Sequence, residues 1–440
     1  MTGRGLILAA PASGSGKTLV TAGLLRHLRR RGLRVAAAKA GPDYIDPTFH
    51  AAACERPCIN LDVWAMRPAT LAGLVAELEA NSDIVVCEGV MGLFDGTGPD
   101  GEAGSTAELA KITGWPVVLV VDARRQGASA AALIGGFARH DPALPIAGVI
   151  FNRVAGPRHR ELLQTALARH VPDLSCLGAI PREPTLALRE RHLGLVPAAE
   201  HRNSETVIKV AASIIGESLD IETLVALAHA SQLTGSAPAM PLQPLGQRIA
   251  VARDDAFVFT YAAVIEGWRR AGAELSFFSP LADEPPDPHA DAIYLPGGYP
   301  ELHAGRLAAA ERFLGGLSQA AADGTPIYGE CGGYMAMGEA LTDAEGNTHR
   351  MAGLLPLATS FAERRLHLGY RSLTLLQDGP LGRSGARFRG HEFHYATVLS
   401  ASGDGLFAAA DSCGVDLGPA GLRCGSVAGS FMHLIDRAED

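Results

Sequence analysis

Short, wholly apolar runs alternate with longer segments of helical period over the first third of the chain. Such runs are typical of strands in a parallel sheet that is covered on both faces. The expected strands are residues 6–10, 35–38, 84–87, 117–121 and 147–151, and the expected helices include residues 19–31 and 206–230. We therefore predict a doubly wound α/β domain, with its functional site at the carboxyl ends of the strands.

The same alternation starts again near residue 248, after a stretch rich in proline and small residues. Its expected elements are the strands 249–252, 275–278, 293–295 and 326–328 and the helix 257–270. A chain of 440 residues is long enough for two domains of ordinary size. We predict that residues 1–231 form one domain, residues 247–440 form a second α/β domain, and residues 232–246 link them.

A glycine-rich turn, residues 11–18 (PASGSGKT), stands between the first expected strand and the first expected helix. Strand, glycine-rich turn, Lys-Thr and helix is the layout of a phosphate-binding loop, whose backbone N–H groups turn towards phosphate oxygens. Pro11 replaces the first glycine of the strict motif, so the match is to a variant loop. We expect Lys17 to reach the outer phosphates and the Thr18 hydroxyl to bind Mg²⁺.

Polar side chains follow the other expected strands of the first domain. Asp46 and Glu88 are the best candidates as Mg²⁺ ligands, because Mg²⁺ binds carboxylate oxygens alongside phosphates. Lys39 is placed to steady a transferring phosphoryl group, and the amide of Asn152 could read an adenine edge. Ser105 opens an expected helix, and the sequence leaves open whether it caps that helix or belongs to the site.

Residues 329–333 (GECGG) follow an apolar strand in the second domain and have the layout of a nucleophile elbow, with cysteine as the nucleophile. Small flanking residues permit the strained turn that exposes the Cys331 sulfur. The backbone N–H groups of Gly298 and Gly332 are candidates to bind an oxyanion. His433 is the candidate base, so the pattern predicts a cysteine–histidine nucleophilic centre.

Composition excludes several classes of protein. The net charge of -9 argues against a nucleic-acid partner, and no apolar run approaches the roughly 20 residues of a membrane span. We expect a cytoplasmic protein, because the first residues do not resemble a signal peptide. The seven cysteines are scattered and do not form a disulfide framework. His50, Cys54 and Cys58 have regular spacing, but Pro57 interrupts them, so no metal site is expected there.

Taken together, these motifs resemble the family of cobyrinic acid a,c-diamide synthases over nearly the whole chain. The N-terminal half is similar to the dethiobiotin-synthetase branch of P-loop proteins, and the C-terminal half to class I glutamine amidotransferases. The motifs that carry the resemblance are residues 13–18 (SGSGKT), 41–47 (GPDYIDP), 88–96 (EGVMGLFDG), 297–301 (GGYPE), 330–333 (ECGG) and 389–394 (RGHEFH).

The resemblance implies a ligase of cobalamin (vitamin B12) biosynthesis. ATP would activate the a and c acetate side chains of cobyrinate or hydrogenobyrinate as acyl phosphates, and ammonia from L-glutamine would then displace phosphate. The implied nucleotide-binding residues are Ser13, Gly14, Ser15, Gly16, Lys17, Thr18 and Asn152. The implied metal ligands for Mg²⁺ are Thr18, Asp46 and Glu88. The implied catalytic residues are Asp43 and Asp95, near the carboxylate being activated, and Cys331 and His433, which would release ammonia. Lys39, read from its place after a strand, is the further catalytic candidate, at the transferring phosphoryl group.

One departure concerns the acid that usually follows the base as His-x-Glu. The chain reads His433-Leu434-Ile435-Asp436, so an apolar residue stands in the acid's place. The family resemblance implies a Cys–His pair without the usual third member.

Three other functions are compatible with parts of the sequence. The nearest is a cobyric acid synthase-like corrinoid amidotransferase, against which the 41–47 and 391–394 motifs argue. The others are a partition-type P-loop ATPase, which has no use for Cys331, and a scaffold with an inactive amidotransferase domain. The sequence leaves open the presence of cobalt in the corrin, the order of amidation and the oligomeric state, for which a homodimer is one option. It also leaves open whether the polar clusters 364–371 and 389–395 serve substrate or a domain interface.

Overall fold

The computed structural model describes residues 3–186, 190–191, 194–195, 203–235 and 240–438. The chain forms two compact units: Met1–Trp64 with Pro68–Ala239, and Ala65–Arg67 with Met240–Asp440. The division between Ala239 and Met240 falls inside the expected linker, of which residues 236–239 lie outside the described residues. No sequence signal indicated that Ala65–Arg67 would group with the second unit.

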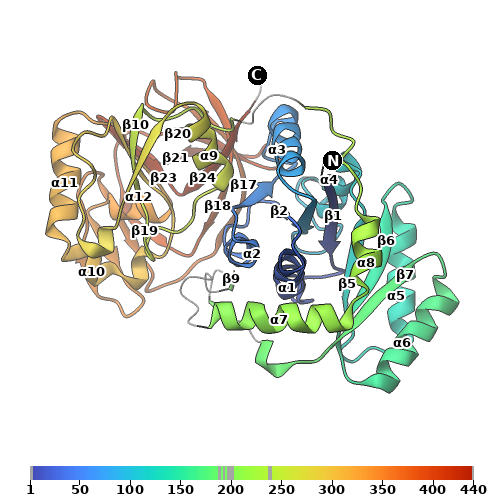
Figure 1. Cartoon of the computed structure of the whole chain (residues 1–440). Coiled ribbons are helices and arrows are strands. Elements are labelled where there is room, and N and C mark those ends of the chain that lie inside the picture. The colour runs from blue at the N-terminus through green and yellow to red at the C-terminus, as the bar shows by residue number, and fades with distance from the viewer. Residues whose placement is uncertain (1–2, 187–189, 192–193, 196–202, 236–239, 439–440) are drawn as a thin grey trace. The chain divides into compact units, whose positions relative to one another are not determined.

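A seven-stranded parallel sheet forms the first unit, with strand order β3-β2-β4-β1-β5-β6-β7 (Figure 1). The predicted doubly wound α/β fold is therefore confirmed for this unit. The strands β3 and β7 were not predicted, because β3 is short and β7 mixes polar residues and glycine with its apolar ones. The strands are β1 (Arg4–Ala9), β2 (Val35–Ala40), β3 (Cys58–Leu61), β4 (Ile84–Glu88), β5 (Val117–Asp122), β6 (Ile146–Val154) and β7 (Ser175–Pro181).

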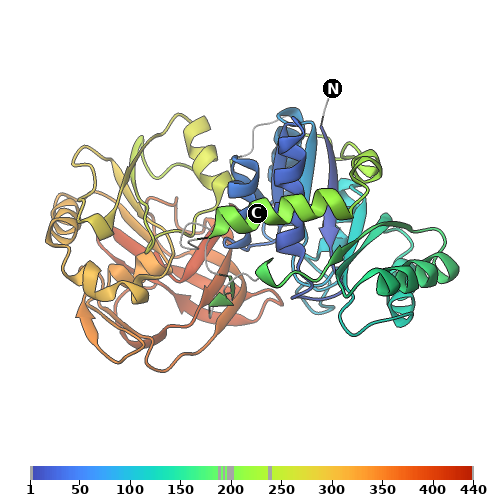
Figure 2. The same ribbon diagram turned by 60° about the horizontal axis from the view of Figure 1, so that its bottom comes forward.

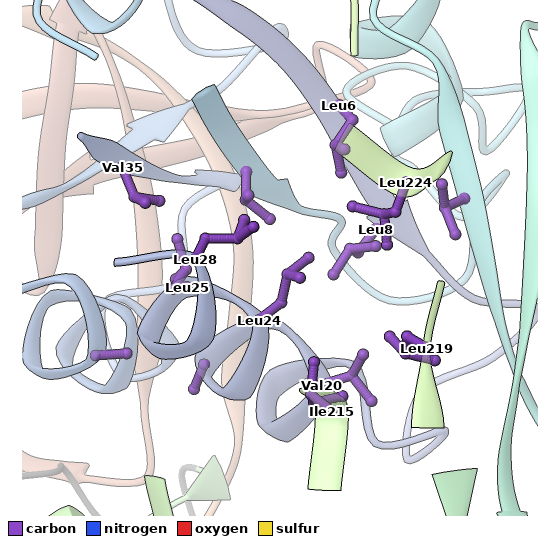
Figure 3. Close-up of a cluster of buried hydrophobic side chains, with 14 of the residues drawn as sticks. Leu6, Leu8, Val20, Leu24, Leu25, Leu28, Val35, Ile215, Leu219 and Leu224 are labelled. Carbon is purple, nitrogen blue, oxygen red and sulfur yellow. The ribbon is translucent and has the colours of Figure 1, made fainter. Parts of the chain in front are cut away.

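Helices connect these strands, and α1 contributes the centre of the first unit's core. Leu24, Leu25 and Leu28 of α1 form one buried cluster with Leu6 and Leu8 of β1 (Figure 3). This packing fixes the helix, and therefore the turn that precedes it, against the middle of the sheet. The helices are α1 (Lys17–Arg30), α2 (Asp46–Cys54), α3 (Pro68–Ala80), α4 (Thr106–Thr113), α5 (Ser129–His140), α6 (Pro157–His170), α7 (Ser204–Ser218), α8 (Ile221–Leu227) and the 3-10 turn η1 (Pro184–Leu186).

Helix α7 packs across α1, as the light green and dark blue helices in Figure 2 show. Gly23 allows this close approach, because a Cβ on it would lie 2.9 Å from Cγ1 of Ile215. The expected single helix 206–230 was wrong: α7 ends at Ser218 and α8 begins at Ile221. Asp220 separates the two helices by accepting a hydrogen bond from the backbone N–H of Thr223 at 3.0 Å, as an N-cap does. A two-stranded ribbon, β8 (Glu190–Arg191) and β9 (Gly194–Leu195), precedes α7.

The second unit contains a six-stranded sheet with the order β11-β10-β12-β13-β23-β22, in which only β22 runs antiparallel. Its first four strands match the sequence expectation, whereas the expected helix 257–270 begins only at Ala262. The strands are β10 (Arg248–Ala252), β11 (Glu274–Phe278), β12 (Ala292–Leu295), β13 (Ile327–Glu330), β22 (Leu422–Cys424) and β23 (Val427–Ser430). The helices are α9 (Ala262–Arg270), α10 (Ala304–Ala308), α11 (Glu311–Ala322), α12 (Gly332–Ala336) and the 3-10 turns η2 (Pro280–Ala282) and η3 (Pro300–Leu302).

Two further sheets complete the second unit, and no sequence pattern had predicted them. One has the order β21-β20-β17-β18-β24 and the other β15-β14-β16-β19. Only Phe431 separates β23 of the parallel sheet from β24 of the antiparallel one, so the chain steps between the sheets there. The strands are β14 (Ala340–Thr342), β15 (Thr348–Arg350), β16 (Leu357–Ser360), β17 (His367–Leu375), β18 (Arg387–His394), β19 (Thr397–Ala401), β20 (Phe407–Asp411), β21 (Asp416–Ala420) and β24 (Met432–Arg437).

Across the described part of the chain, no helix combines the length and apolarity needed to cross a membrane.

Candidate active sites

The glycine-rich turn joins β1 to α1, and polar contacts hold it from the end of β6. Gly14 and Gly16 have left-handed φ angles of 76° and 89°, which glycine adopts without strain. The Asn152 amide donates to the Ser15 carbonyl at 2.8 Å, and Arg153 donates to the Gly14 carbonyl at 2.7 Å. The turn is therefore a fixed backbone loop at a helix N-terminus, which suits phosphate oxygens. The predicted phosphate-binding residues Ser13, Gly14, Ser15, Gly16, Lys17 and Thr18 are all on this turn or the first turn of α1.

Asn152 also lines a hollow beside the turn, together with apolar side chains that include Leu19, Ile180 and Ile214. An apolar hollow next to a phosphate-binding turn has the character needed to hold a nucleotide base. The amide nitrogen of Asn152 is occupied by the Ser15 carbonyl, so its direct role in reading adenine stays a prediction. Arg153 was not among the predicted site residues, although it follows Asn152 directly in the chain.

A buried network of charges lies at the carboxyl ends of β2 and β4. The Lys39 Nζ donates to Asp46 Oδ2 at 2.7 Å and lies 3.4 Å from Glu88 Oε1. The Thr18 hydroxyl donates to Glu88 Oε1 at 3.0 Å. His50, on α2, is hydrogen-bonded to Glu88 Oε2. The structure thus brings four predicted site residues together from three separate segments of the sequence, and adds His50.

The network determines the charge of its members. Burial raises the pKa of Glu88, but Lys39 and His50 outweigh it and lower that pKa to about 2. Burial lowers the pKa of Lys39, and the carboxylates of Asp46 and Glu88 reverse the shift, so the pKa lies well above its usual value. Burial also lowers the pKa of Lys17, whose Nζ donates to the Met91 carbonyl at 2.6 Å. Glu88 is therefore an anion at neutral pH, opposite cationic Lys39.

Thr18, Asp46 and Glu88 fit the requirements of a Mg²⁺ site. All three offer oxygen atoms, and the hydroxyl of Thr18 already touches the carboxylate of Glu88. Glu88 is 1% exposed, so its charge is not screened by water.

Two further carboxylates, Asp43 and Asp95, lie on the loops after the same strands. Asp43 Oδ1 accepts from the backbone N–H of Ile45 at 2.7 Å, and its Oδ2 lies 4.0 Å from Lys39 Nζ. Burial and the neighbouring Asp46 raise the pKa of Asp43 to about 7. Asp95 is exposed, and its Oδ2 accepts from the backbone N–H of Gly92 at 2.8 Å.

Other residues singled out from the sequence have structural roles. The Ser105 Oγ accepts from the backbone N–H of Glu108 at 3.2 Å, so Ser105 is the N-cap of α4. Cys54 and Cys58 are buried in the core of the first unit, whereas His50 bonds to Glu88 instead. His50 lies one helical turn after Asp46 on α2, and this spacing could have identified it as a site residue.

Cys331 sits at a sharp turn between β13 and α12. Its φ of 47° and ψ of -103° are strained for a residue with a side chain, as expected at a nucleophile elbow. Gly333 is required there, because a Cβ on it would lie 2.0 Å from the Leu295 carbonyl oxygen. The pKa of the Cys331 thiol lies above its usual value, because burial raises it by more than the backbone N–H groups of Gly332 and Gly298 lower it. Both predicted oxyanion donors therefore face the sulfur.

His433 lies beside this turn, on β24. A Cβ placed on Gly297 would be 3.1 Å from His433 Nε2 and 3.2 Å from Cys331 Cβ, so both side chains border that glycine. Pairing of β13 with β23 brings Cys331 close to His433, because the Cys331 N–H donates to the carbonyl of Ser430, three residues before His433, at 2.8 Å. Burial lowers the pKa of His433 to about 3. The imidazole is therefore neutral and can accept a proton.

The two residues near the acid's usual place lie in other surroundings. Ile435 is buried in the core, and Asp436 forms an ion pair with Arg67, whose Nη2 lies 2.8 Å from Asp436 Oδ1.

The cluster 389–395 forms a polar network within the antiparallel sheet. Arg371 donates to Glu392 Oε2 at 2.8 Å, and His394 Nε2 lies 3.0 Å from Glu392 Oε1. The end of this strand reaches the elbow, because Cys331 Sγ lies 3.9 Å from the Phe393 carbonyl oxygen. Whether the cluster also serves substrate stays open.

Comparison with known proteins identifies both halves. Residues 6–196 match the CobQ/CobB/MinD/ParA nucleotide binding domain, and residues 248–440 match the CobB/CobQ-like glutamine amidotransferase domain. A hydrogenobyrinate a,c-diamide synthase of Brucella suis biovar 1 is 54% identical over 98% of this chain and 98% of its own length. Proteins of the same name from Rhizobium meliloti, with 99% of this chain and 100% of theirs covered, and Rhodobacter capsulatus, with 98% of each, are both 52% identical. The chain therefore belongs to the hydrogenobyrinate a,c-diamide synthase family.

Proposed function

We propose that this protein converts two acetate side chains of hydrogenobyrinate, a and c, into amides, with ATP and glutamine as co-substrates. It is a ligase that forms C–N bonds with glutamine as amido donor and acts in cobalamin biosynthesis. The names of these relatives favour hydrogenobyrinate, the cobalt-free corrin, over cobyrinate, a choice that the sequence alone leaves open.

Activation of the carboxylate takes place at the buried charge network of the first unit. A substrate carboxylate oxygen attacks the γ-phosphorus of ATP, the bond to the β,γ-bridging oxygen breaks, and an acyl phosphate and ADP form. Lys17 and Lys39 offset charge that spreads over the transferring group. Thr18, Asp46 and Glu88 would hold Mg²⁺, which neutralises phosphate charge when bound. Asp43 and Asp95 position the side chain that reacts.

Ammonia comes from glutamine in the second unit. The Cys331 thiol gives its proton to His433 Nε2, and the thiolate attacks the side-chain amide carbon. The N–H groups of Gly298 and Gly332 bind the oxyanion. His433 then protonates the leaving amine, a thioester forms, and water hydrolyses it to glutamate. Ammonia displaces phosphate from the acyl phosphate and leaves an amide.

One observation supports this proposal most strongly. A single chain contains both a glycine-rich turn facing the Lys39–Asp46–Glu88 network and a cysteine elbow facing a neutral histidine. A partition-type ATPase needs only the first of these, and a scaffold needs neither.

The test supplies purified protein with hydrogenobyrinate or cobyrinate, ATP, Mg²⁺ and glutamine, and follows the product by mass spectrometry. We expect a monoamide followed by a diamide from hydrogenobyrinate, with one ADP and one glutamate formed per amide. A substrate that already carries the a and c amides serves as the control for cobyric acid synthase-like activity. Amidation of that control in preference to hydrogenobyrinate would overturn the proposal.

A cytoplasmic location and a homodimer stay part of this proposal. Use of ATP and glutamine supports the cytoplasmic location, because both are cytoplasmic metabolites. Light scattering of the purified protein tests for the homodimer.

A further inference from the structure

The residues that follow the base His433 on its own strand have surroundings of their own. Ile435, which stands where related amidotransferase motifs carry an acid, is apolar and 1% exposed. Asp436, the next residue, accepts hydrogen bonds from both the backbone and the guanidinium of Arg67. A carboxylate on another element does lie beside this imidazole.

Such a carboxylate lies directly before the nucleophile in the sequence. Glu330 Oε2 is 3.8 Å from His433 Nδ1, within the range of an ion pair. The two side chains are 4% and 1% exposed, so water does not screen their interaction. Strand pairing produces this contact, because Glu330 at the end of β13 is opposite Ser430 of β23, three residues before His433.

Glu330 accepts hydrogen bonds from three donors. Oε1 accepts from the backbone N–H of Leu434 at 3.0 Å and from the Tyr328 hydroxyl at 3.2 Å. Oε2 accepts from the Tyr294 hydroxyl at 2.8 Å. Donors on both oxygens favour the ionised carboxylate, whereas burial raises the pKa of Glu330 to about 7. A positive charge arriving on the adjacent imidazole favours the ionised form further.

The opposite edge of the imidazole faces the nucleophile. Nε2 and Cys331 Cβ both border Gly297, and Nδ1 points to Glu330. The ring thus spans the space between a carboxylate and a thiol, which is the order of groups in a catalytic triad.

We propose that Glu330 is the positioning residue of the glutaminase centre, holding His433 with its proton on Nδ1 so that Nε2 presents its lone pair to the Cys331 thiol. When Nε2 takes the thiol proton, the imidazolium carries a positive charge beside the Glu330 carboxylate, which offsets it. The proton then passes from Nε2 to the leaving ammonia, and Glu330 gains and loses no proton. This inference rests on the roles proposed above for Cys331 and His433.

The test is the Glu330→Gln variant, measured by glutamate release. Its amide keeps the size of the side chain and can still accept from Leu434, but an NH₂ group facing His433 favours the tautomer with the proton on Nε2. We expect kcat to fall on the order of a hundredfold, the lower end of what general base catalysis supplies. KM for glutamine and amidation with ammonium salt should stay unchanged, because neither depends on the tautomer.

Tyr328→Phe is the matched control. It removes a donor to Oε1 from the same buried pocket but leaves the carboxylate next to His433, so kcat should stay within about threefold of wild type, as for loss of one net hydrogen bond. A wild-type kcat in Glu330→Gln, or an equal fall in both variants, would overturn the positioning role. If Glu330→Gln does not fold, Glu330→Asp takes its place, because it moves the carboxylate away from His433 by one methylene. A wild-type kcat in Glu330→Asp would also overturn the positioning role.

Cys331→Ala and His433→Ala belong in the same assay. If either variant keeps glutamine hydrolysis, the proposed nucleophilic centre fails, whatever Glu330 does. If both lose it and Glu330→Gln does not, only the positioning role fails.

Discussion

Arg67 and Asp436 are 369 positions apart in the sequence and form a bidentate ion pair, with Nη2 2.8 Å from Oδ1 and Nε 3.2 Å from Oδ2. Asp436 is fully buried, and the Arg67 backbone N–H adds a third bond at 2.8 Å. The carboxylate that the sequence places nearest to His433 is therefore engaged in tertiary structure.

This pairing predicts that Asp436→Ala and His433→Ala fail in different ways. Asp436→Ala removes one partner of a buried ion pair and should lower the free energy of unfolding by on the order of 3 kcal/mol. Below its melting temperature it should retain glutamine hydrolysis, whereas His433→Ala should lose hydrolysis even far below its own melting temperature, because the base is gone. Thermal melts and glutamate release measured side by side check this, and equal losses of hydrolysis in the two variants would contradict it.

Cys331→Ala should abolish glutamine-dependent amidation but leave amidation with concentrated ammonium salt at raised pH. The proposed phosphate chemistry belongs to the other unit and does not involve the sulfur. Alanine should be tolerated at the turn, where Cys331 already has a positive φ of 47°. Product mass with each nitrogen source is the measurement. Continued use of glutamine would place the nucleophile elsewhere, and failure with ammonium would show that the two activities are not separable.

Lys17→Ala should abolish amidation with either nitrogen source, because its ammonium group is placed to meet the charge on the outer phosphates. Its Nζ donates to the Met91 carbonyl within the described part of the chain, and loss of this one contact should leave the fold intact. Circular dichroism and ADP release measure the two effects. Near-normal ADP release would exclude the proposed phosphate role of the turn.

Asp46→Asn and Glu88→Gln should each raise the Mg²⁺ concentration needed for half-maximal activity by about tenfold or more, because each removes one of very few carboxylate ligands. Both substitutions remove a negative charge beside Lys39, but Glu88 also faces His50 and is more deeply buried, with its side chain 1% exposed against 15% for Asp46. Glu88→Gln should therefore lower the melting temperature more than Asp46→Asn. Titration with Mg²⁺ at saturating ATP is the experiment, and an unchanged requirement in both variants would remove these residues from the ligand set.

Asp43→Ala and Asp95→Ala should change the ratio of monoamide to diamide, because one site must present two different acetate side chains in turn. Asp43→Ala should be the less stable of the two variants, because Asp43 accepts two backbone hydrogen bonds near the start of α2, whereas Asp95 accepts one in its own loop. Time courses of both products by mass spectrometry measure the ratio. An unchanged ratio in both variants would exclude a role in presenting the side chain.

The sequence predicted the parts of this fold that depend on local pattern. Apolar runs such as residues 117–121 identify buried parallel strands whatever lies around them. The antiparallel sheet around β18 was missed, because residues 387–394 mix charged and aromatic residues without a clear alternation of apolar and polar positions, and polar as well as apolar side chains of this strand are buried. The motif residues Lys39, Asp46 and Glu88 were identified, but their hydrogen bonds to one another were not.

Glu330 shows most clearly what a single sequence cannot reveal. It reads as one small part of an elbow motif, and its proximity to His433 depends on β13 pairing with β23 nearly a hundred residues later. Arg67 is a similar case, since nothing local connects residues 65–67 with β24.

The grouping of Ala65–Arg67 with Met240–Asp440 also constrains the order in which the chain can fold during synthesis. The first unit's strands emerge early and are close together in sequence, so they can pair while translation continues. Arg67 must wait for Asp436, and Cys331 must wait for His433, both of which leave the ribosome with the same strand. A nascent chain released before β24 would therefore lack the strand that carries both His433 and Asp436.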